Sequence, residues 1–396
     1  MRRLIWGRPG RFFPVKSPLD FAATIPALLF LKAGILFFIV LTAGFATAQP
    51  PPFRQALPGY SYHFPRDFYA HNDFKLEWWY YTGNLEDESG RPFGYQLTFF
   101  RVALDGAGKI QNPSRWKIEN VYFAHMALSD IEANEFLFFE RINRAGLGNA
   151  GAESDRPLVW NEDWTLTQQE KLHRLKAMES GTGLDLSLVP LKELVIHGES
   201  GVSVKSEAEG NASHYFSYTR MQTEGSIFIK GREYRVRGTS WMDREFSSNQ
   251  LTEGQVGWDW FSLKLDNQME IMLYRIRLKN GGTEPRSSGT LVSPGGAGRH
   301  LRLSDFTIAP TGRWTSPRTG ASYPSGWEVV LPNDQIYLKI TPDMPAQELY
   351  ELRSISGSYW EGSVTVTGRY GELPVKGKGY VELVGYGQAL RTSLPE

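Results

Sequence analysis

Three short segments combine carboxylic acids with aromatic side chains, a mixture that can support acid catalysis. They comprise residues 71–83 (HNDFKLEWWYYTG), 238–246 (GTSWMDREF) and 257–265 (GWDWFSLKL). If the second segment is a β-strand, alternate residues share one face, and Trp241, Asp243 and Glu245 lie together. A carboxyl group on an apolar wall keeps its proton to a higher pH, because burial disfavours the ionised form. An aromatic face beside it can stabilise a developing cation.

These properties suit the protonation of an isolated C=C bond, after which water or a base completes the reaction. In segment 257–265, Asp259 is in phase with Phe261 and Leu263, so a regular strand would turn it towards an apolar interior. The predicted catalytic residues are Asp243, Trp241, Asp259 and Glu245.

An apolar ligand is expected to contact aromatic residues of the same segments. In a strand through 71–83, every second side chain shares one face. The predicted ligand-binding residues are Glu77, Trp79, Tyr81, Trp258 and Trp260. The structural alternative is that these tryptophans close the end of a β-barrel, while the acids pair with arginines such as Arg101, Arg244 or Arg275. An acid fixed beside an arginine would be a permanent carboxylate and not a proton donor.

The sequence lacks the residues that other common catalytic mechanisms require. The 396-residue chain has no cysteine, which excludes a thiolate metal site, a catalytic cysteine and a disulfide framework. The sequence contains no GxSxG, HExxH, phosphate-loop or GxGxxG pattern. Its seven histidines are scattered, whereas a metal site needs three or four convergent ligands. We therefore expect no metal and no cofactor, and hydrolysis by an activated nucleophile is disfavoured.

Residues 1–48 have the features of a targeting segment. A basic lead is followed by the apolar run 33–41 and then by Ala46-Thr47-Ala48, a small-x-small cleavage pattern. This pattern predicts a signal peptide and an exported protein. The alternative is an uncleaved membrane anchor, because the apolar residues 21–31 extend the hydrophobic region towards the length of a bilayer span.

The charge balance argues against a nucleic-acid partner. The whole chain has 43 basic and 43 acidic residues, for a formal net charge of +0. Residues 1–48 hold six basic residues and one acidic residue, so their removal leaves about −5. An acidic mature chain lacks the basic surface that nucleic-acid binding requires. The expected partner is instead a hydrophobic small molecule, a lipid or an isoprenoid.

The rest of the sequence is typical of an all-β protein. Aromatic residues make up 13% of the chain, and 40 glycines and 23 prolines can supply turns. Residues 93–99 alternate with period two, and 257–265 and 269–278 are spaced as a hairpin. Residues 167–179 could form a helix by propensity, although their leucines fit neither period. The glycine-rich stretch 281–298 is expected to be a long loop.

The length of the chain indicates two β domains. About 340 ordered residues exceed one small barrel, and the strands show no βαβ alternation, so we predict two antiparallel β-barrel domains. The expected division is a proline-rich linker or N-terminal arm at 49–70, an N-terminal domain at 71–246 and a C-terminal domain at 247–396.

Several segments together resemble the AttH-like/carotenoid 1,2-hydratase (CrtC-like) family. The matching motifs are EWWYYTG at 77–83, FGYQLTFFR at 93–101, SWMDREF at 240–246, GWDWF at 257–261, YWEGSV at 359–364 and GYVELVGY at 379–386. The resemblance covers nearly the whole mature chain and is specific for the family, although not for one activity. It implies two lipocalin-like β domains packed together, and a bacterial protein exported to the periplasm or secreted.

The resemblance also implies a site. In the hydratases of this family an Asp in an aromatic cavity protonates the terminal double bond of an acyclic carotenoid, and the matching residue is Asp243, with Trp241 beside it. The hydratase pattern has a histidine before that Asp and an asparagine two residues after it, where this chain has Met242 and Glu245. The resemblance therefore supports the fold more than the reaction.

Two functions of different classes follow from the sequence. The first is an exported lipocalin-like protein that binds a long apolar ligand and has a functional link to a membrane transport system. The second is a hydratase or isomerase that protonates a C=C bond with an Asp as general acid.

Overall fold

Strands make up nearly all of the regular structure, as the aromatic and glycine-rich composition predicts. The computed structural model describes residues 53–104, 118–249, 251–355 and 357–387. Within these ranges the helical elements are short 3-10 turns, namely η1 (Arg66–Phe68), η2 (Leu303–Asp305) and η3 (Pro332–Asp334). None of the described helices has the length and apolar character needed to cross a membrane.

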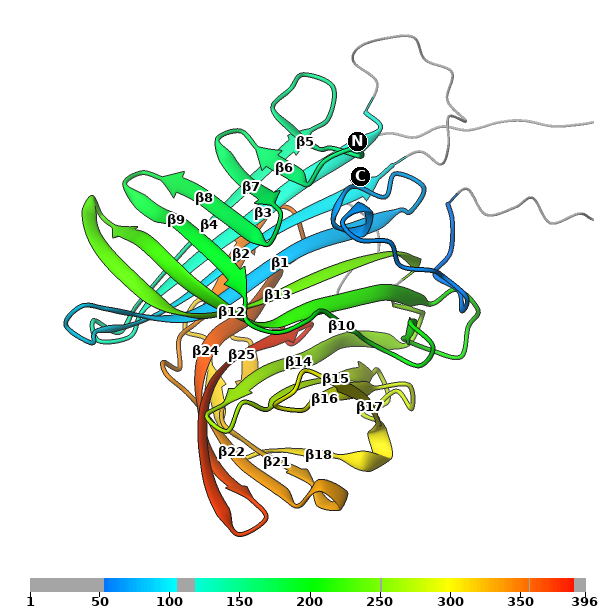
Figure 1. The fold of residues 1–396 in the computed structure, drawn as a ribbon, viewed down its shortest axis with the longest axis vertical. Helices are drawn as coiled ribbons and strands as arrows, with labels where there is room; N and C mark the ends of the chain where they lie inside the picture. Colours follow the sequence, from blue (N-terminus) through cyan, green and yellow to red (C-terminus); the bar gives the residue numbers. More distant parts are fainter. Residues whose placement is uncertain (1–52, 105–117, 250, 356, 388–396) are drawn as a thin grey trace, which may run out of the picture. The chain divides into compact units, whose positions relative to one another are not determined.

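The first sheet is antiparallel and forms a nearly closed barrel (Figure 1). Its strands run in the order β4-β3-β2-β1-β13-β12-β9-β8-β7-β6-β5, and β10 and β11 also pair with β12. Their bounds are β1 (Leu76–Asp87), β2 (Pro92–Ala103), β3 (Asn120–Asp130), β4 (Glu135–Arg144), β5 (Ala150–Ala152), β6 (Leu158–Asn161), β7 (Trp164–Gln169), β8 (Leu172–Glu179), β9 (Thr182–Pro190), β10 (Val195–Ile196), β11 (Ser203–Val204), β12 (Ala212–Ile229) and β13 (Arg232–Asn249). Side chains bridge the remaining gap, because Arg141 and Asn143 of β4 both donate hydrogen bonds to Asn161 of β6.

The second sheet takes in the strands that follow β13. It runs in the order β17-β16-β15-β14-β25-β24-β22-β21-β18, with β23 paired to β24, and β19 and β20 form a separate two-stranded sheet. Their bounds are β14 (Gln255–Leu265), β15 (Glu270–Leu278), β16 (Ser288–Val292), β17 (Gly298–Arg302), β18 (Thr307–Pro310), β19 (Arg313–Thr315), β20 (Ser322–Pro324), β21 (Trp327–Leu331), β22 (Ile336–Pro342), β23 (Glu348–Leu352), β24 (Gly357–Tyr370) and β25 (Leu373–Val384). The two end strands, β17 and β18, are consecutive in the chain and are joined through η2.

Period-two alternation sends the side chains of β1 into two different environments. Trp79 and Tyr81 belong to the apolar core of the first sheet. Trp78 and Tyr80 belong instead to an aromatic cluster shared with residues of the second sheet. A shift of one residue would exchange the two sets, so the register of β1 decides which aromatic residues reach the space between the sheets.

Strand β14 is divided in the same way. Phe261 and Leu263 lie in the core of the second sheet, whereas Trp258 and Trp260 contact the aromatic cluster between the sheets. Each sheet therefore has its own apolar core, and aromatic side chains from both fill the space where they meet.

The two sheets pack through β1 against β25, β2 against β24 and β12 against β14 (Figure 1). A glycine on β2 permits this close approach, since a Cβ on Gly94 would lie 2.7 Å from the Tyr380 hydroxyl and 2.9 Å from the Ser363 Cβ. Asn84 of β1 donates hydrogen bonds across the contact to Ser363 Oγ at 2.9 Å and to the Gly379 carbonyl at 3.1 Å. The described residues of the two sheets accordingly belong to one compact unit.

Two local expectations differ from the structure. Residues 167–179 do not form a helix, because they belong to the β7–β8 hairpin, in which Leu166 and Leu175 pair and are both buried. The stretch 281–298 is not one long loop, since it contains the buried strand β16. The small residues of β16 do not give the sequence pattern of a strand. One of them, Gly289, packs closely against β15, since a Cβ there would lie 2.4 Å from the Met272 carbonyl oxygen.

The chain passes from the first sheet to the second between β13 and β14, close to the expected domain boundary at 246/247. The division into two domains nevertheless stays a prediction. The expected signal peptide at 1–48 lies outside the described residues, as do the first residues of the expected linker.

Candidate functional site

A cavity of about 420 Å³ lies between the two sheets. Much of its wall is aromatic and includes Trp78, Tyr80, Phe100, Trp258, Trp260 and Tyr274. Its lining also contains five carboxyl-bearing residues: Glu77, Asp243, Glu245, Glu361 and Glu382. A concave, mostly apolar site with a few polar groups is typical of small-molecule binding. The cavity is therefore the candidate functional site.

Asp243 is held on the cavity wall by three neutral donors. Trp241 Nε1 donates to Oδ1 at 2.6 Å, the Tyr215 hydroxyl donates to Oδ2 at 2.6 Å, and the Ser217 hydroxyl donates to Oδ1. Strand pairing explains the arrangement, because Ser217 of β12 is directly opposite Asp243 of β13 and Tyr215 is two residues before it. All of these side chains therefore lie on the same face of the sheet.

The Asp243 carboxyl group is poised to change its protonation state near neutral pH. Burial raises its pKa to about 7, the three hydrogen bonds act in the opposite direction, and the nearby Glu245 adds a further increase. The group makes no ion pair with any described residue. A carboxyl group with this pKa can both donate and accept a proton at physiological pH.

His197 contacts Ser217, one of the three donors to Asp243, and also contacts the second sheet. Its Nε2 lies 2.7 Å from Ser217 Oγ and its Nδ1 lies 2.8 Å from Thr290 Oγ1 on β16 of the second sheet. Burial lowers the pKa of His197 to about 3, so the ring is neutral at physiological pH. A neutral ring that donates from Nε2 leaves the Ser217 hydrogen for Asp243. The orientation of Ser217 thus depends on a residue that bridges both sheets.

A second acidic pair lines the cavity from the other sheet. Glu361 of β24 and Glu382 of β25 are directly opposite each other in the strand register. The Tyr80 hydroxyl donates to Glu361 Oε1 at 2.6 Å, and Trp258 Nε1 donates to Glu382 Oε2 at 2.8 Å. Burial raises the pKa of Glu382 to about 7 and that of Glu361 well above its ordinary value, with the charge of Glu382 adding to the latter.

Glu245 has a cationic partner, unlike Asp243. Lys205 Nζ lies 3.3 Å from Glu245 Oε1, and the Ser213 hydroxyl donates to the same oxygen. Lys205 also lies over the ring of Tyr274, with Nζ 4.1 Å from the ring centre. Glu245 is therefore a paired carboxylate in the cavity wall.

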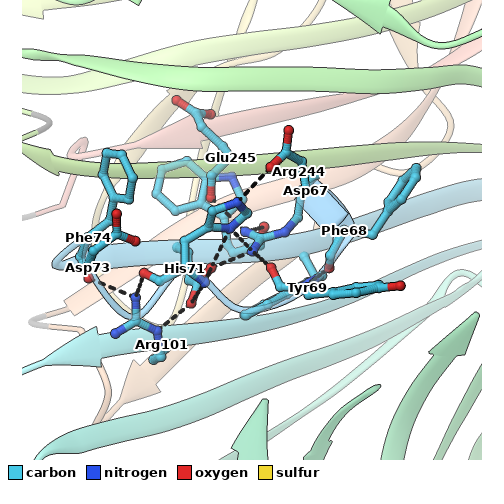
Figure 2. A network of polar contacts seen from close by, with 12 residues as sticks. Asp67, Phe68, Tyr69, His71, Asp73, Phe74, Arg101, Arg244 and Glu245 are labelled. Atoms are coloured by element: carbon cyan, nitrogen blue, oxygen red, sulfur yellow. Dashed lines mark hydrogen bonds and ion pairs between the residues drawn. The ribbon is translucent and has the colours of Figure 1, made fainter. Parts of the chain in front are cut away.

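Glu77 is the centre of a buried ion-pair network with Arg101 and Arg244. Figure 2 shows the two arginines of this network beside His71. Arg101 and Arg244 each donate to one of its oxygens, and the His71 backbone N–H donates to Oε2 at 3.0 Å. Burial alone would raise the pKa of Glu77, but the two arginines outweigh it and hold the pKa well below its ordinary value. Arg244 also stacks on Trp79, 3.9 Å from the ring centre. This carboxylate is fixed and stays charged.

Asp259 lies apart from the cavity lining. Arg275 donates to its Oδ2 at 2.6 Å, Arg277 to its Oδ1 at 3.1 Å, and the Tyr386 hydroxyl to Oδ1 at 2.8 Å. It is buried on the core side of β14, as its phase predicts, but between two cations. A catalytic role for Asp259 stays a prediction, and this environment favours a fixed carboxylate over a proton donor.

The predicted aromatic ligand contacts fall into two groups. Trp258 and Trp260 line the cavity, and Trp260 Nε1 donates to the Tyr215 hydroxyl at 3.2 Å. Trp79 and Tyr81 lie inside the first sheet, where Trp79 Nε1 donates to the Phe68 carbonyl at 3.0 Å and the Tyr81 hydroxyl lies 2.7 Å from His173 Nδ1. The structure therefore brings Trp241, Asp243, Glu245, Trp258 and Trp260 together and places Trp79, Tyr81 and Asp259 elsewhere.

Five further residues of the site were not predicted from the sequence, namely Tyr80, Tyr215, Ser217, Glu361 and Glu382. A signal was present for the two glutamates, because each follows aromatic or apolar neighbours, Tyr359-Trp360 before Glu361 and Tyr380-Val381 before Glu382. No local signal pointed to Ser217, which reaches Asp243 only through the pairing of β12 with β13. Within the described part of the chain, no group of three or more His, Asp or Glu side chains is arranged to hold a metal ion.

Comparison with known proteins places this fold and sequence in a family. The AttH-like family model matches residues 55–386. The chain belongs to the AttH-like family. A solved structure from Nitrosomonas europaea, assigned to AttH, is 35% identical, with a TM-score of 0.76 over 84% of this chain and 100% of that one. No curated protein matches the sequence.

A more distant neighbour shows how far the fold extends. Kievitone hydratase from Nectria haematococca is 16% identical to this AttH-like protein, with a TM-score of 0.60 over 85% of this chain and 98% of that one. At this identity the likeness is one of fold. The family resemblance read from the motifs is thus confirmed, and the lipocalin-like architecture is shared with a hydratase.

Proposed function

We propose that this AttH-like protein binds a compact, largely apolar molecule in the cavity between its sheets and donates a proton to it from Asp243. The reaction class is acid-catalysed hydration or isomerisation of a C=C bond. The observation that carries the proposal is the Asp243 carboxyl group, which lies on an aromatic cavity wall without a cationic partner among the described residues and has a pKa of about 7.

The proposed chemistry follows from the groups around Asp243. Its proton adds to one carbon of the double bond, and the positive charge forms on the other carbon. The face of Trp260 on the same wall can stabilise that charge, since a desolvated aromatic ring attracts a cation. Water then adds to the cation and returns a proton to the Asp243 carboxylate, or loss of a neighbouring proton gives the isomer.

The size of the cavity narrows the ligand expected from the sequence. A volume of about 420 Å³ is typical of a site for a small molecule, whereas a long isoprenoid would extend beyond it. The ligand is therefore a short isoprenoid or a molecule of similar bulk. The shared fold of kievitone hydratase, a hydratase by name, is consistent with this reaction class.

Ligand binding without chemistry is the second candidate function. Both oxygens of Asp243 already accept hydrogen bonds from the protein, which is the pattern of a structural carboxylate. In this alternative Asp243 orients Tyr215, which lines the cavity, and its bond to Trp241 only holds the carboxylate in place. The protein would then retain its ligand unchanged.

The proposed reaction depends on the protonated form of Asp243. We expect the rate of hydration to be constant at low pH and to fall as pH rises through about 7, because the donor loses its proton. The pH profile of kcat measured with geraniol, an acyclic isoprenoid of suitable size, tests this. A rate that rises through the same range would mean that Asp243 does not act as the acid.

Trp241 tunes the acid by its hydrogen bond. Trp241→Phe removes an N–H donor that favours the ionised carboxylate, so we expect the pKa of Asp243 and the descending limb of the pH profile to move to higher pH. Trp164→Phe is the matched control, because Trp164 Nε1 donates to the Met178 carbonyl in the first sheet. An unshifted profile in Trp241→Phe, with the fold intact, would remove this tuning role.

We further propose that the protein is exported, as residues 1–48 suggest. Cleavage after Ala48 gives a mature chain that begins at Gln49. Mass spectrometry of the intact protein purified from its native host measures this directly. Retention of residues 1–48 in a membrane fraction would support the anchor instead. A link to a membrane transport system is part of the same proposal and would be tested by affinity purification of the exported form.

A further inference from the structure

The carboxyl groups of the cavity outnumber the cations that could neutralise them. Lys75, Arg101 and Lys205 are the cationic side chains in its lining. Arg101 is committed to Glu77 and Lys205 to Glu245. Among the described residues, no ion pair neutralises the remaining three carboxyl groups, those of Asp243 on β13, Glu361 on β24 and Glu382 on β25.

Two hydrogen-bond acceptors of the lining are also unsatisfied. Glu361 Oε2 and Gln96 Oε1 are buried and have no hydrogen-bond partner among the described residues. Both side chains are only 1% exposed, and both residues line the cavity. A buried acceptor without a donor is costly, and native proteins usually satisfy it. A ligand with more than one N–H or O–H donor would supply what is missing.

Aromatic residues hold the two glutamates in place. The Tyr80 hydroxyl binds Glu361, and the Trp258 indole N–H binds Glu382, so each acid is oriented by a neutral aromatic donor that also lines the cavity. Carboxylates among aromatic faces form the environment that favours an organic cation, because both the charge and the ring electrons attract it.

The cavity already holds one ammonium group in such a setting. Lys205 Nζ lies 3.3 Å from a Glu245 oxygen and 4.1 Å from the centre of the Tyr274 ring. The chain therefore satisfies Glu245 with an acid–aromatic–ammonium arrangement of its own. The same arrangement beside Glu361 lacks only the ammonium group.

We propose that the ligand of this cavity carries a primary amine, which binds as an ammonium ion to Glu361 and is neutralised by Glu361 and Glu382 together. The proposal rests on the proposed function in so far as it concerns the same cavity, and it names the class of molecule that the cavity takes. An ammonium group offers three N–H donors, enough for Glu361 Oε2 and Gln96 Oε1, whereas a hydroxyl group offers one.

Binding of an ammonium ion is coupled to pH. Glu382 has a pKa of about 7 because it is buried without a cation, and the charges of Asp243 and Glu245 raise it further. Burial also raises the pKa of Glu361 well above its ordinary value. An ammonium ion favours the ionised form of both carboxyl groups, so binding releases protons, and affinity rises as pH increases through about 7. The groups that face this pair also include Lys75, Arg101, Lys205 and Glu77, of which the last three form ion pairs.

Geranylamine and geraniol provide a matched pair of probes, because they share one apolar chain and differ in the terminal group. We expect the wild-type chain to bind geranylamine about tenfold to a hundredfold more tightly than geraniol, as befits a charge-assisted hydrogen bond. Titration calorimetry in two buffers of different ionisation enthalpy measures both the affinity and the protons released. Glu361→Gln should abolish the preference for the amine, and Glu382→Gln should reduce both the preference and the proton release.

Glu253→Gln is the control, because Glu253 is exposed and does not line the cavity. Circular dichroism establishes that each variant is folded. Because Glu361→Gln and Glu382→Gln are independent, the proposal can still be tested if one of these two variants fails to fold. Any of three results would overturn the amine proposal. Geraniol could bind as tightly as geranylamine or more tightly, neither probe could bind, or Glu361→Gln could keep the preference for the amine. Hydration of geraniol that depends on Asp243 would still support the proposed function, so the two proposals can fail separately.

Discussion

Asp243→Asn is expected to lower the rate of hydration of geraniol or geranylamine by about a hundredfold to ten-thousandfold, the usual contribution of a general acid. Asparagine keeps the shape of the side chain but has no proton to give to carbon. Its amide oxygen can still accept the hydrogen bond from Trp241, and its NH2 group can donate to the Tyr215 hydroxyl oxygen, so the cavity should survive. Gas chromatography and mass spectrometry with ¹⁸O-labelled water measure the product.

The matched control for this substitution is Asp185→Asn, since Asp185 is exposed on β9. We expect its rate to equal that of the wild type. Retained probe binding with lost turnover in Asp243→Asn would support the enzyme over the binding protein. A variant that binds and turns over its probe within about twofold of the wild type would contradict the assignment of Asp243 as the acid.

Glu77→Gln is expected to destabilise the fold by about 3–5 kcal/mol, the usual cost of breaking a buried ion pair. The substitution leaves Arg101 and Arg244 without their carboxylate, and both guanidinium groups are almost wholly buried. Urea unfolding followed by tryptophan fluorescence at neutral pH measures the change in the free energy of unfolding. Glu253→Gln, on the surface, should change it little.

The Glu77 contribution also has a defined pH dependence. Its pKa in the folded protein is well below the ordinary value of 4.5, so folding favours the ionised form. The stabilisation is complete above pH 4.5 and is lost as pH falls towards the folded pKa. The difference between the wild type and Glu77→Gln should therefore shrink on acidification. A difference that grows at low pH, or that is small at neutral pH, would contradict the role of this network.

The fold class and the family could be predicted from sequence because their signals are local. Alternation of apolar residues defines strands without knowledge of their partners, and the motif at 240–246 already places Trp241 beside Asp243. The pairing of Asp259 with an arginine could also be predicted, since Asp259 and Arg275 are directly opposite each other in the β14–β15 hairpin. Short-range pairing of this kind follows from the length of the connecting turn.

The remainder of the site depends on contacts between distant residues. Both faces of β1 are equally aromatic, and only its packing against β25 decides that Trp78 and Tyr80, and not Trp79 and Tyr81, reach the cavity. Glu361 and Glu382 meet through the β24–β25 pairing and face a cavity completed by the other sheet. No sequence period encodes which two sheets will share a cavity.

The protonation state of Asp243 tests its role as the proton donor most directly. A ¹³C NMR titration of the aspartate side-chain carboxyl groups, with Asp243→Asn to assign the signal, measures it without any knowledge of the substrate. We predict a midpoint near pH 7, because burial without a cationic partner among the described residues outweighs the three hydrogen bonds. A carboxyl group that stays ionised to the ordinary aspartate value of 3.8 would contradict the assignment of Asp243 as a proton donor.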